Sequence, residues 1–187
     1  MIVKNSTIAD CKIIIPRVYK DNRGSFTELY NSQVFKKKTK INKVFLQDNI
    51  SISKKNVLRG LHFQLKKPQG KLIKVISGKI FDVAVDLRPK SSTYKKYFGI
   101  ILSSDNNIQF WIPEGFAHGF YTMSDSATVL YKCTSLYDSS DENTLAWNDV
   151  SFKIKWPFYG APIQSRKDKD AKNFSLLEKK IQTYLVK

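Results

Sequence analysis

Two histidines are the side chains of this chain best suited to proton transfer near neutral pH. His62 lies in the sequence VLRGLHFQ, three residues after Arg59 and two before Gln64, and His118 lies in PEGFAHGF. Each histidine could instead be a hydrogen-bonded residue of the core, and composition alone leaves both interpretations open. Polar and charged neighbours on a strand of a small barrel favour a lined cavity, because interior and exterior positions alternate along such strands.

Metal binding is a second chemistry open to histidine. A histidine-rich metal centre needs closely spaced imidazoles together with further nitrogen, sulfur or carboxylate ligands. Each candidate segment here holds a single histidine, and no His-x-His sequence exists. The two cysteines, Cys11 and Cys133, are far apart and have no second thiol nearby. We therefore predict no metal, no disulfide framework and two free cysteines that fill small buried spaces.

The formal net charge is +16 and the isoelectric point about 9.8. This excess would suggest a nucleic-acid partner. However, the lysines are scattered, and no recognition helix, zinc-finger spacing or aromatic-basic signature accompanies them. We expect a solvated basic surface that attracts an anionic substrate, and no nucleic-acid partner.

Period-two alternation of apolar residues from residue 10 to residue 155 predicts the elements that hold these side chains. The clearest segment, residues 71–88, has two apolar runs on either side of Ser77-Gly78-Lys79, which predicts a tight hairpin. Further strands are expected over 44–47, 97–102, 108–112, 119–123 and 128–134. Their regular spacing and turn-rich connections predict an antiparallel sandwich or barrel.

Helix signals are few. We expect a short helix within 31–39 and an amphipathic helix over 173–185, which places Phe174, Leu177, Ile181 and Leu185 on one face. No repeat or composition break divides the chain, so residues 1–187 are predicted to form a single domain. No apolar run is long enough to cross a membrane, and the first residues lack the pattern of a signal peptide. We expect a cytoplasmic protein without a membrane partner.

Several segments resemble, in register, the dTDP-4-dehydrorhamnose 3,5-epimerase family. The match extends from about residue 3 to residue 170. Its segments are DNRGSFTELYN (21–31), FLQDNISISKKNVLRGLHFQ (45–64), QGKLIKVISGKIFDVAVDLR (69–88), WIPEGFAHGFYTMSD (111–125), LYKCTSLY (130–137) and AWNDVSFKIKWP (146–157). The resemblance implies an all-β cupin jelly-roll barrel with a few short helices. It also implies a homodimer whose N-terminal strand exchanges with the partner.

The resemblance further implies an isomerase that needs no cofactor. It would invert C3 and C5 of dTDP-4-dehydro-6-deoxy-D-glucose to give dTDP-4-dehydro-L-rhamnose, for L-rhamnose and polysaccharide biosynthesis. Hydrogens beside a 4-keto group are acidic, so a base, an enolate-stabilising group and an acid suffice. By the family pattern, His62 is the base, Tyr131 the acid, Asp168 the carboxylate that orients the histidine, and Lys71 the cation near the enolate oxygen.

The same residue-by-residue transfer implies a set of substrate-binding residues. Arg23, Arg59 and Lys167 would hold the diphosphate, and Tyr137 would stack on the thymine. Asp82 would support a histidine near the pocket. The remaining positions that match contacts to the nucleotide or sugar are Glu28, Gln47, Asp48, Asn49, His118 and Glu142. The family often has two adjacent tyrosines where this chain has Leu136-Tyr137, a difference at the edge of the nucleobase pocket.

Three other functions remain to be weighed against this one. A relative that epimerises only C3 or only C5 of a nucleotide 4-keto-6-deoxy sugar would keep the same base. A 4-keto sugar isomerase of related fold would also use histidine chemistry, although the Tyr131 and Lys71 contexts favour the epimerase. A cupin that binds a sugar nucleotide or nucleic acid without turnover would explain the charge but not His62 and Tyr131 together.

Overall fold

The computed structural model describes residues 1–158 and 160–185. Strands dominate it, as the alternation of apolar residues predicted. The strands are β1 (Ile2–Asn5), β2 (Lys12–Ile15), β3 (Val18–Asp21), β4 (Gly24–Thr27), β5 (Gln47–Lys54), β6 (Leu58–Gln64), β7 (Lys71–Ser77), β8 (Lys79–Asp86), β9 (Tyr97–Ser103), β10 (Gln109–Ile112), β11 (Phe116–Thr122), β12 (Ser126–Cys133) and β13 (Glu142–Thr144). The helices are α1 (Ser32–Thr39), α2 (Arg166–Lys169) and α3 (Phe174–Leu185).

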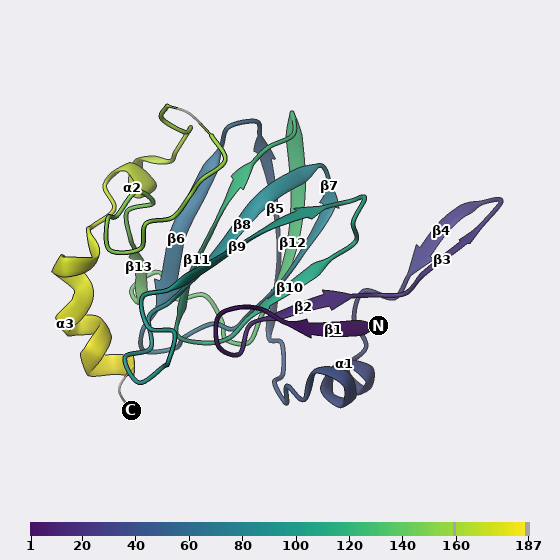
Figure 1. Ribbon diagram of the computed structural model, residues 1–187, viewed down its shortest axis with the longest axis horizontal. Coiled ribbons are helices and arrows are strands. Elements are labelled where there is room, and N and C mark those ends of the chain that lie inside the picture. The colour runs from purple at the N-terminus through teal and green to yellow at the C-terminus, as the bar shows by residue number, and fades with distance from the viewer. Residues whose placement is uncertain (159, 186–187) are drawn as a thin grey trace.

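Two antiparallel sheets form the barrel (Figure 1). One has the strand order β1-β2-β10-β7-β12-β5, and the other has the order β13-β6-β11-β8-β9. Neighbours in each sheet are mostly distant in sequence, which is typical of a jelly roll, in which successive strands alternate between sheets. The predicted all-β barrel with short helices is confirmed.

The hairpin predicted at Ser77-Gly78-Lys79 is wrong, although both of its strands exist. β7 pairs with β10 and β12 in the six-stranded sheet, whereas β8 pairs with β11 and β9 in the five-stranded sheet. Gly78, with φ of +80°, turns the chain from one sheet into the other. The glycine between the two apolar runs is therefore a corner of the barrel and not a hairpin turn. Long-range pairing decides which strands each run pairs with.

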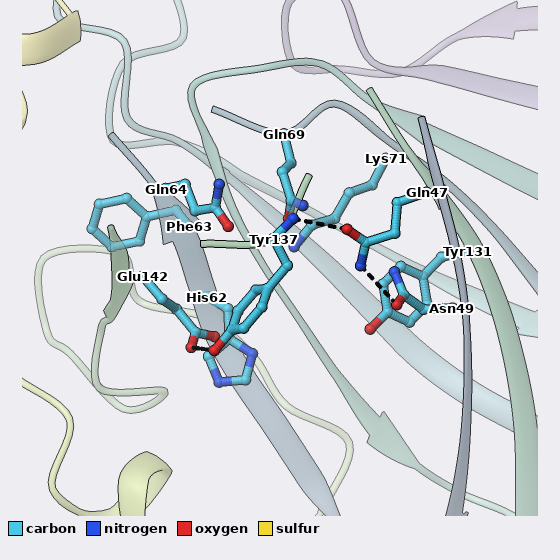
Figure 2. Close-up of a pocket in the computed structure, with 10 residues that line it drawn as sticks. All are labelled: Gln47, Asn49, His62, Phe63, Gln64, Gln69, Lys71, Tyr131, Tyr137 and Glu142. Carbon is cyan, nitrogen blue, oxygen red and sulfur yellow. Dashed lines mark hydrogen bonds between the residues drawn. The ribbon is translucent and has the colours of Figure 1, made fainter. Parts of the chain in front are cut away.

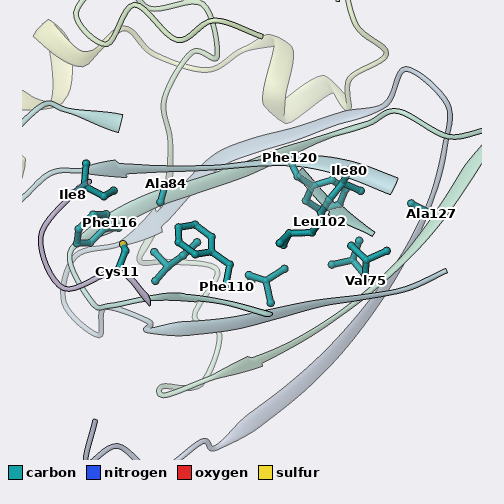
Figure 3. Packing of buried hydrophobic residues seen from close by; sticks show 13 residues of the cluster. Ile8, Cys11, Val75, Ile80, Ala84, Leu102, Phe110, Phe116, Phe120 and Ala127 are labelled. Atoms are coloured by element: carbon teal, nitrogen blue, oxygen red, sulfur yellow. The ribbon is translucent and has the colours of Figure 1, made fainter. Parts of the chain in front are cut away.

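The space between the sheets is filled by an apolar cluster, seen closely in Figure 3. Ile73 and Val75 from β7 face Ile80 and Ala84 from β8, and Phe110 lies among them. Each of these side chains is completely buried. Burial of apolar surface at about 25 cal/mol per Å² makes this cluster a large contributor to the stability of the fold. It fills one end of the barrel interior and leaves the other end to polar side chains.

Helix α3 covers the outer face of the five-stranded sheet (Figure 1). Phe174, Leu177 and Ile181 are buried against Val83 and Val85 of β8. This confirms the predicted C-terminal helix and its apolar face. The predicted helix within 31–39 is confirmed as α1, which buries Phe35 in a smaller cluster on the six-stranded sheet.

Strands β3 and β4 form a separate two-stranded ribbon that projects away from the barrel (Figure 1). Tyr19 and Phe26 on this ribbon are 50% and 68% exposed and contact mainly each other. A two-stranded ribbon without a core is marginally stable by itself in water. Among the described residues, no helix is long and apolar enough to span a membrane.

Candidate active site

A polar cavity of about 280 Å³ opens at the end of the barrel that the apolar cluster leaves free. Strands of both sheets and the loops at their ends contribute to it (Figure 2). Seven predicted site residues and three others line it: Gln47, Asn49, His62, Lys71, Tyr131, Tyr137 and Glu142, with Phe63, Gln64 and Gln69. The structure thus brings together residues that lie up to 95 positions apart in the sequence.

Two glycines allow the histidine strands to pack closely. His62 on β6 lies directly opposite His118 on β11, and the register shifts next to this pair. A Cβ atom at Gly60 would lie 2.6 Å from the carbonyl oxygen of His118, and one at Gly119 would lie 2.6 Å from that of Arg59. Any side chain at these positions would force the strands apart and displace both histidines.

Asp168 fixes one ring nitrogen of His62. The Asp168 Oδ1 lies 2.6 Å from His62 Nε2, and the Asp168 side chain is only 4% exposed. A carboxylate at this distance holds the proton on Nε2 and so leaves Nδ1 able to accept one. Helix α2 brings Asp168 to β6, and the backbone N–H of Leu58 donates to the carbonyl oxygen of Ile163 just before that helix.

The charge state of Asp168 suits this role. Burial alone would raise the pKa of the carboxyl, but the hydrogen bonds from His62 and Ser165, with the backbone N–H of Gly60, bring it below its ordinary value. Asp168 is therefore ionised near neutral pH and favours a positive charge on His62 when that ring accepts a proton.

The second histidine has its own carboxylate. His118 Nε2 lies 2.9 Å from Asp82 Oδ2, and both side chains are buried. Burial lowers the pKa of His118 despite the nearby Asp82 charge, so this ring is neutral near pH 7. The predicted support of a histidine by Asp82 is therefore present in the geometry. His118 is not among the residues that line the cavity.

Tyr131 and Lys71 enter the cavity from the six-stranded sheet, opposite the strand of His62 (Figure 2). Burial raises the pKa of the Tyr131 phenol above its ordinary value, so the phenol keeps its proton. Burial also lowers the pKa of Lys71, while negative charges around it act in the opposite direction. Within residues 1–158 and 160–185, no ion pair engages the Lys71 amine.

Hydrogen bonds connect the residues at the rim of the cavity. The Tyr137 hydroxyl donates to Glu142 Oε2 at 2.7 Å, and Lys167 forms an ion pair with the same carboxylate. The backbone N–H of Tyr137 donates to Gln47 Oε1 at 2.8 Å, and Gln47 Nε2 donates to Asn49 at 2.9 Å. These bonds place the exposed Tyr137 ring over the opening, where a planar ligand group could stack on it.

Six predicted binding residues do not line the cavity: His118 and Lys167, described above, and Arg59, Asp48, Arg23 and Glu28. Arg59 is nearby on β6, where its Nε donates to Ser53, and its charge acts on the pKa of Tyr131. Asp48 points to the outer face of β5 and pairs with Lys132 there. Arg23 and Glu28 belong to the projecting ribbon and the segment after it, and among the described residues Arg23 forms an ion pair only with Asp21.

Three lining residues were not predicted. Gln64 is two positions after His62 on the same strand, and Gln69 is two before Lys71. Strand alternation places residues two apart on one face, so this spacing was the available signal for Gln64. Gln69 precedes β7, where alternation does not apply. The sequence held no signal for Phe63, because alternation puts its side chain on the opposite face from His62. The described residues contain no group of three or more His, Cys, Asp or Glu side chains that could hold a metal ion.

A jelly-roll barrel with a histidine–aspartate pair, a lysine and a phenol around one polar cavity defines a class of enzyme that moves protons on a small polar substrate. A family model described as dTDP-4-dehydrorhamnose 3,5-epimerase matches residues 5–175. The dTDP-4-dehydrorhamnose 3,5-epimerase of Salmonella typhimurium is 50% identical over 169 residues, which cover 90% of this chain and 92% of that protein.

Solved structures agree with this assignment. The dTDP-6-deoxy-D-glucose-3,5-epimerase of Legionella pneumophila, in complex with dTDP-4-keto-L-rhamnose, has a TM-score of 0.93 at 43% identity and covers 96% of this chain and 95% of its own. The Bacillus anthracis epimerase with TDP and PPi bound has a TM-score of 0.88 at 42% identity, with coverages of 91% and 98%. The chain belongs to the dTDP-4-dehydrorhamnose 3,5-epimerase family, and it is an isomerase, as the resemblance predicted.

Proposed function

We propose that this enzyme inverts C3 and C5 of dTDP-4-dehydro-6-deoxy-D-glucose to give dTDP-4-dehydro-L-rhamnose, with His62 as base and Tyr131 as acid. The observation that supports this assignment is the placement of the two side chains. His62, oriented by Asp168 at 2.6 Å, and the protonated Tyr131 phenol line one cavity from opposite sheets. Inversion needs removal of a proton on one face of the sugar and its return on the other.

Each step of the reaction can be assigned to a side chain of this chain. His62 Nδ1 takes the proton from the carbon beside the ketone, and Asp168 stabilises the resulting imidazolium. The electron pair of the broken C–H bond moves onto the ketone oxygen and forms an enolate. The Lys71 ammonium lies in the cavity and stabilises that oxygen, and the developing negative charge favours the charged form of the amine. Tyr131 then protonates the carbon from the opposite face.

The nucleotide would occupy the rim. Tyr137 presents its ring for stacking on the base, while Arg59 and Lys167 supply positive charge for the diphosphate. Glu142 holds both Tyr137 and Lys167, so we assign it a role in shaping this subsite. Gln47 and Asn49 offer amide groups to the sugar. The net charge of +16 favours approach of the anionic substrate.

Arg23 and Glu28 fit this scheme only if a second copy of the chain is present. The ribbon that carries Arg23 projects away from its own barrel (Figure 1). The Arg23 side chain is 86% exposed. Ile50, Ile52 and Ile76 are also exposed on the outer face of the six-stranded sheet. We propose a homodimer in which this face is buried and each ribbon reaches the cavity of the partner.

Solvent-exchange labelling tests the proposed reaction. The enzyme is incubated with dTDP-4-dehydro-6-deoxy-D-glucose in heavy water, and the recovered sugar is analysed by mass spectrometry and NMR. We expect inverted product with deuterium at both C3 and C5. Label and inversion at only one carbon would instead establish the mono-epimerase alternative. No label at either carbon would contradict proton abstraction altogether.

A further inference from the structure

Ser165 forms an unusual helix cap next to the proposed base. It is the N-cap residue of α2, and its Oγ accepts a hydrogen bond from the backbone N–H of Asp168 at 3.1 Å. The same Oγ donates to Asp168 Oδ2 at 2.8 Å. In an ordinary capping box the acidic residue bonds back to the N-cap backbone. Here the carboxylate of Asp168 binds the serine hydroxyl and turns its other oxygen toward β6.

Both oxygens of Asp168 therefore have an assigned partner. Oδ1 binds His62 Nε2 and Oδ2 binds the Ser165 hydroxyl. A carboxylate that is held at only one oxygen can rotate about its Cβ–Cγ bond and weaken the contact at that oxygen. With the second oxygen bonded, the rotation is blocked, and the 2.6 Å contact to the imidazole is fixed by α2.

We infer that Ser165 is a positioning residue for the reaction, which sets the orientation of the His62 ring through Asp168. This inference rests on the proposed role of His62 as the base. Ser165 does not line the cavity, so its effect on the reaction passes through Asp168 and not through contact with the substrate. Ser165 is an exposed residue, so replacement of its side chain leaves the barrel core untouched.

Loss of the hydroxyl has two expected effects. In the part of the chain that the structure describes, the Asp168 carboxylate is then held only by His62 and the backbone N–H of Gly60. It orients the imidazole less well, so a smaller fraction of the enzyme has the base in the geometry for proton removal. In addition, Asp168 loses a donor that stabilises its anion, so the His62–Asp168 pair binds protons more tightly. The acid limb of the pH profile, which reports protonation of this pair, then moves to higher pH. A purely structural role for Ser165 would not produce this second effect.

Three substitutions separate the hydroxyl from the helix cap. Ser165→Ala removes both, whereas Ser165→Gly removes the hydroxyl but keeps a residue that is well tolerated at an N-cap. Ser165→Thr keeps the hydroxyl. We expect kcat/KM to fall about tenfold in the alanine and glycine variants. The acid limb of the pH profile of kcat/KM should move up by about 0.5 pH unit in both. The threonine variant should restore most of both properties.

Two further variants serve as controls. Ser124→Ala removes a serine hydroxyl that likewise accepts one backbone bond and donates another, but in the turn between β11 and β12, and it should leave both properties unchanged. His62→Ala tests the proposed base itself, and activity retained there would refute that proposal. If His62→Ala is inactive while the alanine and glycine variants of Ser165 keep the wild-type pH profile, the inference about Ser165 is wrong and the base assignment stands.

Discussion

At the scale of single residues, the decisive contact joins His62 to Asp168 across 106 positions of sequence. Strand alternation around His62 predicts which neighbours share its face, but it contains nothing about a helix that far downstream. Asp168 lies among charged residues of the sequence, where aspartate is ordinarily solvated, and only the family resemblance pointed to it. The structure places it with a buried carboxylate beside the imidazole. Local sequence cannot supply such a pairing, because tertiary folding creates it.

Asp48 illustrates the opposite case. Gln47 and Asn49 line the cavity, so the alternation of β5 must direct Asp48 to the other face, where it pairs with Lys132. The sequence contained this information, and the residue-by-residue transfer from the family did not use it.

Replacement of Asp168 by Asn tests the pair by activity. The amide keeps the size of the side chain but cannot stabilise an imidazolium by charge. We expect kcat/KM to fall about 10²- to 10³-fold, comparable to the loss of an acid–base group. Steady-state kinetics at several pH values would measure this. Activity within threefold of the wild type would show that His62 does not depend on the carboxylate.

The same substitution has a pH-dependent effect on stability. The folded-state pKa of Asp168 lies below its ordinary value of 3.8, so the ionised carboxylate stabilises the fold above that pH, and this contribution is lost as the pH falls through the folded pKa. Asp168→Asn should therefore lower the free energy of unfolding by about 1–3 kcal/mol at pH 7. The difference from the wild type should shrink below about pH 4. Urea unfolding at both pH values would test this, and an equal difference at both would contradict it.

At the scale of elements, the loop that joins β6 to β7 connects the strand of His62 to that of Lys71. Asp141 holds this loop, because its carboxylate accepts the backbone N–H groups of Leu65, Lys66 and Lys67 at 3.2, 2.8 and 2.9 Å. The Asp141 side chain is buried. A single carboxylate thus fixes the spacing between the proposed base and the proposed enolate-stabilising cation.

Asp141→Ala should damage both stability and catalysis. It leaves three backbone donors without their acceptor, for which we expect a loss of about 3 kcal/mol in the free energy of unfolding. A fall in kcat larger than the rise in KM would show that Lys71 has moved relative to His62. Asp105→Ala, in the exposed loop after β9, is the matched control and should change neither quantity. An Asp141 variant as stable and active as this control would show that Asp141 does not hold the loop between β6 and β7.

Elements could be predicted from sequence where they bury an apolar face. Strands β7 to β12 and the helix α3 were predicted for this reason. The strand expected over 44–47 was placed too early, because β5 begins at Gln47. The ribbon β3–β4 was not predicted, because it has no core and its residues are mostly exposed. The corner at Gly78 was predicted as a hairpin, because the local pattern of a turn is the same whether or not the strands on either side pair with each other.

At the scale of the whole molecule, the proposed dimer makes each active site a joint product of two chains. An Arg23→Ala chain has an intact cavity in its barrel but a defective ribbon. A His62→Ala chain has a defective cavity but an intact ribbon. Each variant alone should be impaired, strongly so for His62. In a mixed dimer the barrel of the Arg23 variant receives the intact ribbon of its partner, so one of two sites is complete.

Mixing the two variants after partial unfolding and refolding should therefore restore activity. Random pairing makes about half of the dimers mixed, each with one complete site, so about a quarter of the wild-type activity is expected. Refolding each variant separately is the control. Activity of the mixture equal to the average of the separate samples would mean that Arg23 does not act across the dimer.

The central claim is that His62 and Tyr131 act on opposite faces of the sugar, and measuring exchange and inversion together tests it most directly. In heavy water, Tyr131→Phe keeps the base, so we expect it to exchange the substrate protons at C3 and C5 while inversion falls at least 10²-fold. His62→Ala should lose both exchange and inversion. Exchange that persists without His62, or inversion that persists at the wild-type rate without the Tyr131 hydroxyl, would contradict the account.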